Sequence, residues 1–150
     1  MSEPSTSGPG TSGPGTSEPG WDGPGRDGPT PFPTVGLLGL GSTGAGIAQV
    51  FAASGRHVVV LETDRARLDA GLAAVAASFD AELTQGRATD RSATPGRITG
   101  TLAVADLAGA DLVLESATED AEPKKALLAR VAAVVGERTP IVTSTSDLSV

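Results

Sequence analysis

The amino-acid sequence predicts an α/β protein with a doubly wound parallel sheet, preceded by a disordered tail. Three observations carry this prediction. After residue 33, short apolar runs alternate with stretches of helical periodicity, which favours parallel strands joined by right-handed crossovers. The runs are continuously apolar, as in a sheet covered on both faces. Glycines are concentrated at the first turn from strand to helix, which favours a Rossmann-like fold.

Residues 1–33 differ in composition from the rest of the chain. They hold 8 of the 20 glycines and 8 of the 11 prolines, with the near-repeat TSGPG and TSEPG. Such a segment buries too little apolar surface to offset the entropy of ordering it. We therefore expect a disordered tail over 1–33 and one folded domain over 34–150. A docking segment around Trp21 is the alternative for the tail.

Charge and composition exclude several classes of function. The net charge of −7 disfavours a nucleic-acid partner. The absence of cysteine excludes a disulfide scaffold, a thiolate nucleophile and a cysteine metal site, and the single histidine excludes a histidine-rich one, so we expect no metal. No apolar run approaches the roughly 20 residues of a membrane helix, and the N-terminus lacks the apolar core of a secretory signal. We expect a cytoplasmic protein without a membrane partner.

The first part of the domain predicts two strands around a helix. Residues 34–38 form a β-branched and aliphatic run that ends at Gly39, as in a buried strand. Residues 45–53 suit a helix, and Gly55 stands where a helix is commonly followed by glycine. Residues 57–61, HVVVL, suit a second buried strand.

A second helix is expected after Asp64, whose side chain can cap its first turn. One apolar stripe at helical spacing marks its inner face: Leu68, Leu72, Val75 and Phe79. The polar stretch over 85–96 then predicts a loop or a frayed helix end.

The remainder of the chain predicts three further strands. Residues 98–102 form a weak third strand and residues 111–116 a fourth, while residues 141–143 begin a fifth. Pro123 suits the first turn of the helix between the last two. The inner face of that helix is expected to consist of Leu127, Val131 and Val134.

The glycine turn predicts a dinucleotide site, because its G-x-G-x-x-G spacing follows a strand and opens a helix. Gly39 permits a tight turn, Gly41 permits close approach of a pyrophosphate, and Gly44 lets the helix lie close to the strand, with Gly46 extending that packing. The pyrophosphate would meet the N–H groups at the helix N-terminus. The residues expected to bind the cofactor here are Gly39, Leu40, Gly41, Ser42, Thr43 and Gly44. A tight packing turn without a ligand is the alternative.

An acidic residue closes the second strand, where the dinucleotide motif requires one. The carboxylate of Glu62 can accept hydrogen bonds from the adenosine ribose diol and repel a 2′-phosphate, which favours NAD over NADP. Arg65 lies nearby and can soften that preference. The alternative for Glu62 is a solvated acid at a strand end.

Three motifs in order resemble the N-terminal domain of the 3-hydroxyacyl-CoA dehydrogenase family, which includes the 3-hydroxybutyryl-CoA dehydrogenases. GLGSTGAGIAQVFAASGRHVVVLE is similar to the family's opening strand, glycine turn and ribose-acid strand. DLVLESATED, followed by Lys124, is similar to its fourth strand and the acidic step after it. TSTSDLSV is similar to its strand-five motif, (S/T)-N-T-S-S-L. The resemblance covers essentially all of residues 34–150.

The resemblance implies oxidation of an L-3-hydroxyacyl-CoA to the 3-ketoacyl-CoA with NAD, in fatty-acid metabolism, by a homodimer. It implies that Glu119 and Lys124 contact the cofactor. It further implies that Ser146 lies between nicotinamide and substrate as a catalytic residue, and that Ser78 lies near the CoA.

The chain departs from the family pattern at three positions. Ser144 replaces an asparagine and loses its two-ended hydrogen bonding. Asp147 replaces a serine and either adds a charge near the thioester or caps the next helix. Gln85 replaces a residue that is often basic and weakens a CoA phosphate contact. These departures leave two alternatives, an altered choice of substrate or a loss of activity.

The family's catalytic histidine and its partner glutamate lie beyond Val150, as does its helical domain. His57, the only histidine, opens the second strand, away from the expected site. We therefore expect an N-terminal piece of such a dehydrogenase, inactive alone because no general base takes the proton of the 3-hydroxyl. Another NAD(P)-dependent β-hydroxyacid dehydrogenase and a non-catalytic NAD-binding module are the alternatives.

Overall fold

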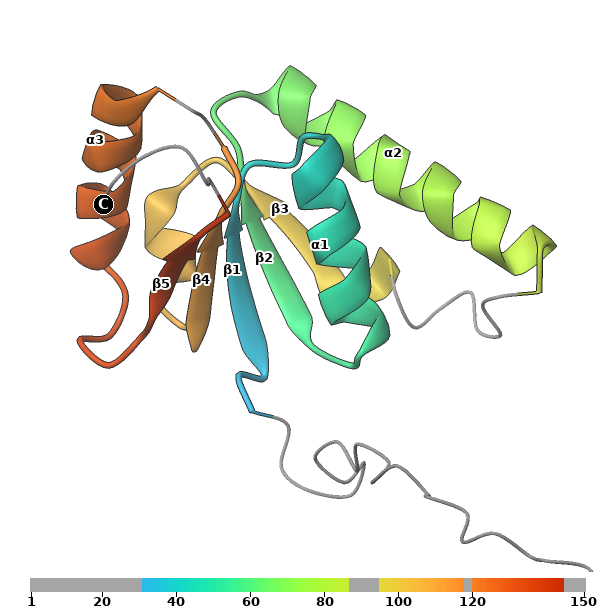
Figure 1. Cartoon of the computed structure of the whole chain (residues 1–150), viewed down its shortest axis with the longest axis horizontal. Coiled ribbons are helices and arrows are strands. Elements are labelled where there is room, and N and C mark those ends of the chain that lie inside the picture. The colour runs from blue at the N-terminus through green and yellow to red at the C-terminus, as the bar shows by residue number, and fades with distance from the viewer. Residues whose placement is uncertain (1–30, 87–94, 118–119, 145–150) are drawn as a thin grey trace, which may run out of the picture.

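The computed structural model describes residues 31–86, 95–117 and 120–144. In these residues one parallel sheet has the strand order β3-β2-β1-β4-β5, with α-helices packed against it (Figure 1). The elements in chain order are β1 (Thr34–Leu38), α1 (Ser42–Ala53), β2 (His57–Leu61), α2 (Arg65–Thr84), the 3₁₀-helix η1 (Pro95–Arg97), β3 (Ile98–Thr101), the 3₁₀-helix η2 (Val104–Leu107), β4 (Leu112–Glu115), α3 (Ala121–Ala132) and β5 (Ile141–Thr143). The predicted Rossmann-like α/β fold is confirmed.

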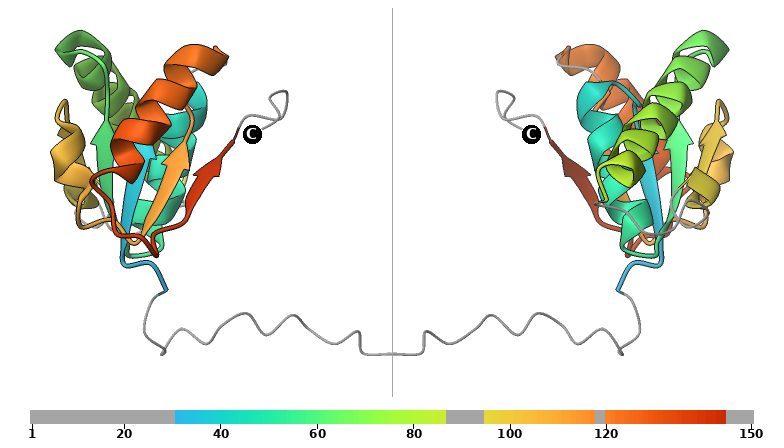
Figure 2. Two further views of the ribbon diagram at one scale, coloured as in Figure 1. Left: turned by 90° about the vertical axis from the view of Figure 1, so that its left-hand side faces the viewer. Right: turned by 90° about the vertical axis from the view of Figure 1, so that its right-hand side faces the viewer.

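The core has two layers because successive residues of each strand point to opposite faces of the sheet. Leu37 packs in the layer under α1 and α2, whereas its neighbour Leu38 packs in the layer under η2 and α3, and both are fully buried. Helices α2 and α3 thus lie on opposite faces and diverge above the sheet (Figure 2). The continuously apolar strands are explained by this double cover.

The strand order places the carboxyl end of β1 at the point where the topology reverses. The chain runs from β1 outward through β2 to β3, and then returns to β4 on the other side of β1. Ligands of open α/β sheets bind in the crevice at this switch point. The glycine turn after β1 therefore lies where this architecture places a ligand.

Most local predictions agree with the structure. Asp64 caps α2, with its Oδ1 accepting a hydrogen bond from the Arg67 N–H at 2.9 Å. Gly55 follows α1 at a φ of +89°, in the left-handed region that glycine adopts readily. The N-terminal tail lies outside the described residues except for 31–33, and its disorder stays a prediction.

Several boundaries and core residues differ from the predictions. Helix α1 begins at Ser42 rather than at residue 45, because Gly41 has an extended backbone and serves as its N-cap. Helix α3 ends at Ala132, so Val134 lies in the turn beyond it, where Val135 packs against the core instead. The prediction that Val134 belongs to the inner face of the helix is therefore wrong.

One core element was not predicted. The 3₁₀-helix η2 carries Leu107, which is fully buried against the η2 and α3 side of the sheet.

Across the described ranges, no helix combines the length and apolar character needed to cross a membrane.

Candidate functional site

Two glycines of the turn after β1 are required by close approaches within the protein. Gly39 has a φ of +91°, and a Cβ there would lie 2.6 Å from the Ala117 Cα. A Cβ on Gly44 would lie 2.2 Å from the Gly39 carbonyl oxygen. Both distances are far below van der Waals contact, so the tight turn and the close helix packing predicted for these glycines are confirmed.

Gly41 differs because its position leaves open space. A Cβ there would meet no atom within 4 Å, and its φ of −67° suits any residue. Glycine is therefore not required at this position by the protein itself, which fits a ligand passing close to the backbone. Gly46 is also exposed with nothing nearby, so the prediction that it extends the close packing is wrong.

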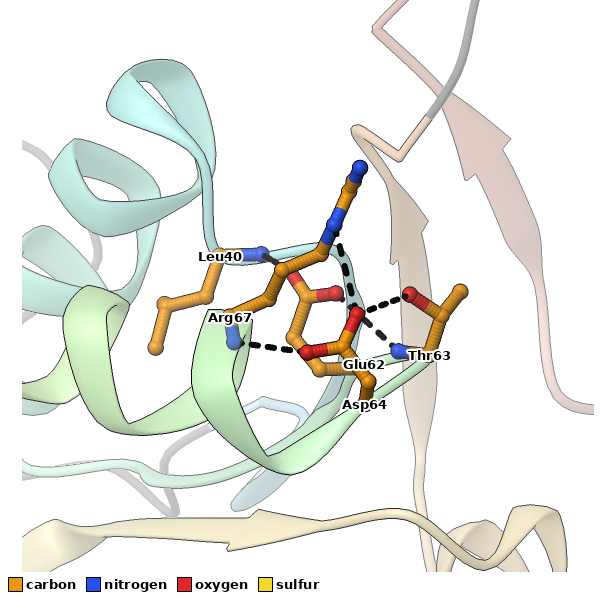
Figure 3. A network of polar contacts seen from close by, with 5 residues as sticks. All are labelled: Leu40, Glu62, Thr63, Asp64 and Arg67. Carbon is orange, nitrogen blue, oxygen red and sulfur yellow. Dashed lines mark hydrogen bonds and ion pairs between the residues drawn. The ribbon is translucent and has the colours of Figure 1, made fainter.

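The carboxylate of Glu62 is tied to the glycine turn by backbone hydrogen bonds. Its Oε1 accepts from the Leu40 N–H at 2.6 Å, and its Oε2 accepts from the Thr63 N–H at 3.1 Å (Figure 3). Each carboxylate oxygen has two lone pairs and so retains one for a further donor. Glu62 is thus a half-buried, oriented acceptor at the edge of the turn and not a solvated strand-end acid.

A cavity of about 960 Å³ opens above the glycine turn. Its lining includes five residues predicted to bind the cofactor: Gly39, Leu40, Gly41, Ser42 and Glu62. One wall is formed by small residues of α2 and the other by α3, where Pro123 and Leu127 contribute apolar surface. The volume lies at the upper end of the usual range for ligand pockets.

The other two predicted residues of the turn do not line this cavity. Thr43 is exposed on the first turn of α1, and Gly44 is buried beneath the turn. Gly41 provides no capping side chain for α1. The first N–H groups of a helix have no intrahelical acceptor and attract anions. A contribution of Thr43 and Gly44 to cofactor binding stays a prediction.

Lys124 lies in a buried polar cluster next to the cavity. Its Nζ is 2.8 Å from the Oε2 of Glu115, and the two side chains are 6% and 0% exposed. The same Oε2 accepts a hydrogen bond from the Thr143 hydroxyl at 2.6 Å, while Oε1 accepts from the Ala117 N–H at 2.8 Å. The cluster therefore joins the ends of β4 and β5 to the start of α3. Sequence analysis missed Glu115, although an acid within an apolar strand indicates a buried partner.

On the first turn of α2, the basic residue that lines the cavity is Arg67 and not the predicted Arg65, while Arg130 lines it from α3. Arg65 pairs with Asp69 at 3.8 Å on the exposed surface of α2, away from the cavity lining. Arg67 lines the cavity, and its Nε lies 3.4 Å from the Oδ2 of Asp64 (Figure 3). Of these two arginines on α2, only Arg67 therefore lies where it can contact a ligand in the cavity.

The remaining predicted residues fall into two groups. Glu119 and Ser146 lie outside the described residues, as does Asp147. Ser78 is exposed on α2 and is not part of the cavity lining. Ser144 follows β5, where its hydroxyl donates to the Glu115 carbonyl at 3.0 Å. Within the described ranges, no three His, Asp or Glu side chains gather into a possible metal site.

Comparison with known proteins identifies close relatives. The model of the family "3-hydroxyacyl-CoA dehydrogenase, NAD binding domain" matches residues 34–150. The chain is 35% identical over 119 residues to a 3-hydroxyadipyl-CoA dehydrogenase of Escherichia coli. This match covers 78% of this chain and 25% of that protein. It is 31% identical over 118 residues to a 3-hydroxybutyryl-CoA dehydrogenase of Bradyrhizobium diazoefficiens, covering 77% of this chain and 40% of that protein.

A solved structure agrees with these relatives. The (S)-3-hydroxybutyryl-CoA dehydrogenase of Ralstonia eutropha superposes with a TM-score of 0.76 at 36% identity, covering 79% of this chain and 42% of that one. The chain therefore spans between a quarter and about two fifths of the length of these three relatives.

Proposed function

The chain belongs to the 3-hydroxyacyl-CoA dehydrogenase family and carries its NAD-binding domain, and from this premise we propose that it is the cofactor-binding part of an L-3-hydroxyacyl-CoA dehydrogenase. The reaction removes a hydride from C3 and a proton from the 3-hydroxyl, which yields the 3-ketoacyl-CoA. NAD accepts the hydride. The observation that carries the proposal is the Glu62 carboxylate, oriented by the Leu40 N–H at the edge of the glycine-lined cavity.

The residues around the cavity suit the parts of a dinucleotide. The remaining lone pairs of Glu62 would accept hydrogen bonds from the two hydroxyls of the adenosine ribose. The open space beside Gly41 would admit the pyrophosphate, close to the N-terminus and the positive dipole end of α1. These contacts bind and orient the cofactor above the carboxyl end of the sheet.

The charge at the ribose end favours NAD over NADP. Beside the predicted ribose position, Glu62 and Asp64 contribute two carboxylates against one guanidinium from Arg67, while Asp120 and Arg130 line the cavity from the side of α3. A 2′-phosphate would replace the hydroxyl that donates to Glu62 and would add negative charge beside two acids. We expect the preference for NAD to persist despite Arg67.

The roles implied by family resemblance remain part of this proposal. They are cofactor contact for Glu119 and Lys124, a catalytic position for Ser146 between nicotinamide and substrate, and proximity to CoA for Ser78. In addition to that contact, we propose that the ion pair of Lys124 with Glu115 orients the turn after β4, where Ala117 lines the cavity.

The substrate, partners and location of the whole protein extend the same proposal. We propose an L-3-hydroxyacyl-CoA substrate, a homodimer and a cytoplasmic location. Three measurements on the full-length protein test these points: turnover with acetoacetyl-CoA and NADH, light scattering after size exclusion, and cell fractionation.

A binding experiment tests the function of this chain directly. NADH fluorescence titration of the 150-residue chain should show saturable binding, tighter than that of NADPH. Circular dichroism verifies that the chain is folded in the same sample. A folded chain that binds neither cofactor would refute the proposed function.

A further inference from the structure

The first turn of α2 carries a cation beside the residue proposed to bind the ribose. Glu62 directly follows β2, Asp64 caps α2, and Arg67 is the third residue of α2 and lines the cavity. The Arg67 side chain is 72% exposed, so it is accessible to a ligand in the cavity. The guanidinium therefore stands at the adenosine end of the site.

Asp64 contacts the guanidinium of Arg67 at Nε, the nitrogen nearest the helix. Its Oδ1 accepts from the Arg67 backbone N–H at 2.9 Å, and its Oδ2 lies 3.4 Å from Arg67 Nε. Figure 3 shows the end of the guanidinium pointing away from Asp64. The contact is made through Nε, so the outer end of the guanidinium is directed away from Asp64.

The space next to Arg67 suits a flat ring. Ala70 and Ala74 follow Arg67 along the α2 wall of the cavity. Pro123 and Leu127 lie on the α3 wall, where Arg130 is the charged residue. The small side chains on α2 leave room, and the apolar residues on α3 favour an aromatic ligand. Adenine is bonded to the ribose carbon beside the diol, so a ribose held by Glu62 places its base in this region.

We propose that Arg67 covers the face of the adenine ring and thereby provides much of the adenosine affinity of this chain. This inference rests on the proposed function, because it assumes a dinucleotide in the cavity. Arginine stacks on aromatic faces through its planar, delocalised guanidinium. A 2′-phosphate is a poorer partner for Arg67, because Asp64 already pairs with the guanidinium and Glu62 adds a second carboxylate.

Substitutions of Arg67 separate stacking from charge. NADH affinity is measured by fluorescence titration for the unaltered 150-residue chain and for R67A, R67K and R67Y. Arg65→Ala is the matched control, since Arg65 lies on the same helix turn but outside the cavity lining. Both arginine side chains are exposed, and circular dichroism checks that every variant remains folded.

We expect R67A to weaken NADH binding between about 3-fold and about 30-fold, the range for a cation over an aromatic ring. R67Y, which keeps a planar face without charge, should bind NADH more tightly than R67K, which keeps charge without the plane. R65A should bind NADH as the unaltered chain does. This order of affinities supports the stacking role.

Three results would overturn the inference while leaving the proposed function intact. One is unchanged NADH affinity in R67A. Another is equal weakening in R65A and R67A, which would indicate a general effect of charge. The third is R67K binding both NADH and NADPH better than R67Y, which would make Arg67 a phosphate ligand. If the folded, unaltered chain binds neither cofactor, the proposed function fails, and the inference fails with it.

Discussion

Removing one partner of the buried ion pair should destabilise the protein strongly. Lys124→Met keeps most of the side-chain length but removes the ammonium that lies 2.8 Å from Glu115 Oε2. The Glu115 carboxylate, fully buried, would retain hydrogen bonds from Ala117 and Thr143 but lose its countercharge. Breaking a buried pair in this way costs about 3–5 kcal/mol, out of the roughly 5–15 kcal/mol that stabilises a typical domain.

The double variant distinguishes pairing from a general loss of packing. Glu115→Gln in the Lys124→Met background removes the uncompensated charge while keeping a side chain of the same size. We expect it to recover about 2 kcal/mol or more, so that the two substitutions are far from additive. The free energy of unfolding is measured by urea denaturation followed by circular dichroism, for the unaltered chain, both single variants and the double variant.

The reasoning would be refuted by a small cost in the single variant. If Lys124→Met lowers the free energy of unfolding by less than about 1 kcal/mol, the pair behaves as an exposed one, and the burial argument is wrong. Strict additivity in the double variant would contradict the pairing of the two groups. A melting temperature that falls in Lys124→Met and recovers in the double variant would agree with the denaturation data.

Three further outcomes are expected. Gly41→Val should abolish NADH binding, because its isopropyl group would occupy the place of the pyrophosphate, with the circular dichroism spectrum unchanged because the position is open; Gly44→Ala, whose Cβ would lie 2.2 Å from the Gly39 carbonyl oxygen, should instead unfold the turn. Glu62→Gln should reduce the ratio of NADH affinity to NADPH affinity by about tenfold, which corresponds to the free energy of a hydrogen bond to a charged group; the same affinity ratio in the variant and in the unaltered chain would contradict this. The 150-residue chain should not reduce acetoacetyl-CoA with NADH, because in this direction a positioned general acid, which protonates the carbonyl oxygen as the hydride arrives at C3, contributes about 10²–10⁴-fold; turnover by the chain alone would contradict this, and Asp147→Ser in the full-length protein tests whether that departure impairs activity.

Local sequence signals were sufficient for most of the sheet and for part of the site. The bounds of β1, β2 and β5 agree with the apolar runs, and the cap of α2 at Asp64 agrees with its residue type. Gly39 was predictable because its turn follows a strand directly. These features depend on interactions between residues close in the chain, where backbone preferences and spacing decide the result.

Contacts between distant segments required the tertiary structure. A Cβ on Gly71 would lie 2.6 Å from Leu40 Cγ, and a Cβ on Gly100 would lie 2.7 Å from a Leu68 methyl group, yet neither glycine belongs to a recognisable motif. The partnership of Glu115 with Thr143 likewise joins two strands that are separated in sequence by α3. Such requirements arise only when helices and strands are packed together.

At the cofactor site, too, some residues were predictable from the sequence and others depended on tertiary packing. Sequence alone was enough to predict that the glycine turn and the acid after the second strand lie together, because parallel strands end at the same edge of a sheet. It did not determine which arginine of RAR reaches the cavity. Two residues apart on a helix means a rotation of about 200°, so Arg65 and Arg67 lie on nearly opposite faces. Only the packing of α2 against the sheet decided that Arg67 lines the cavity and that Arg65 is left on the outer surface.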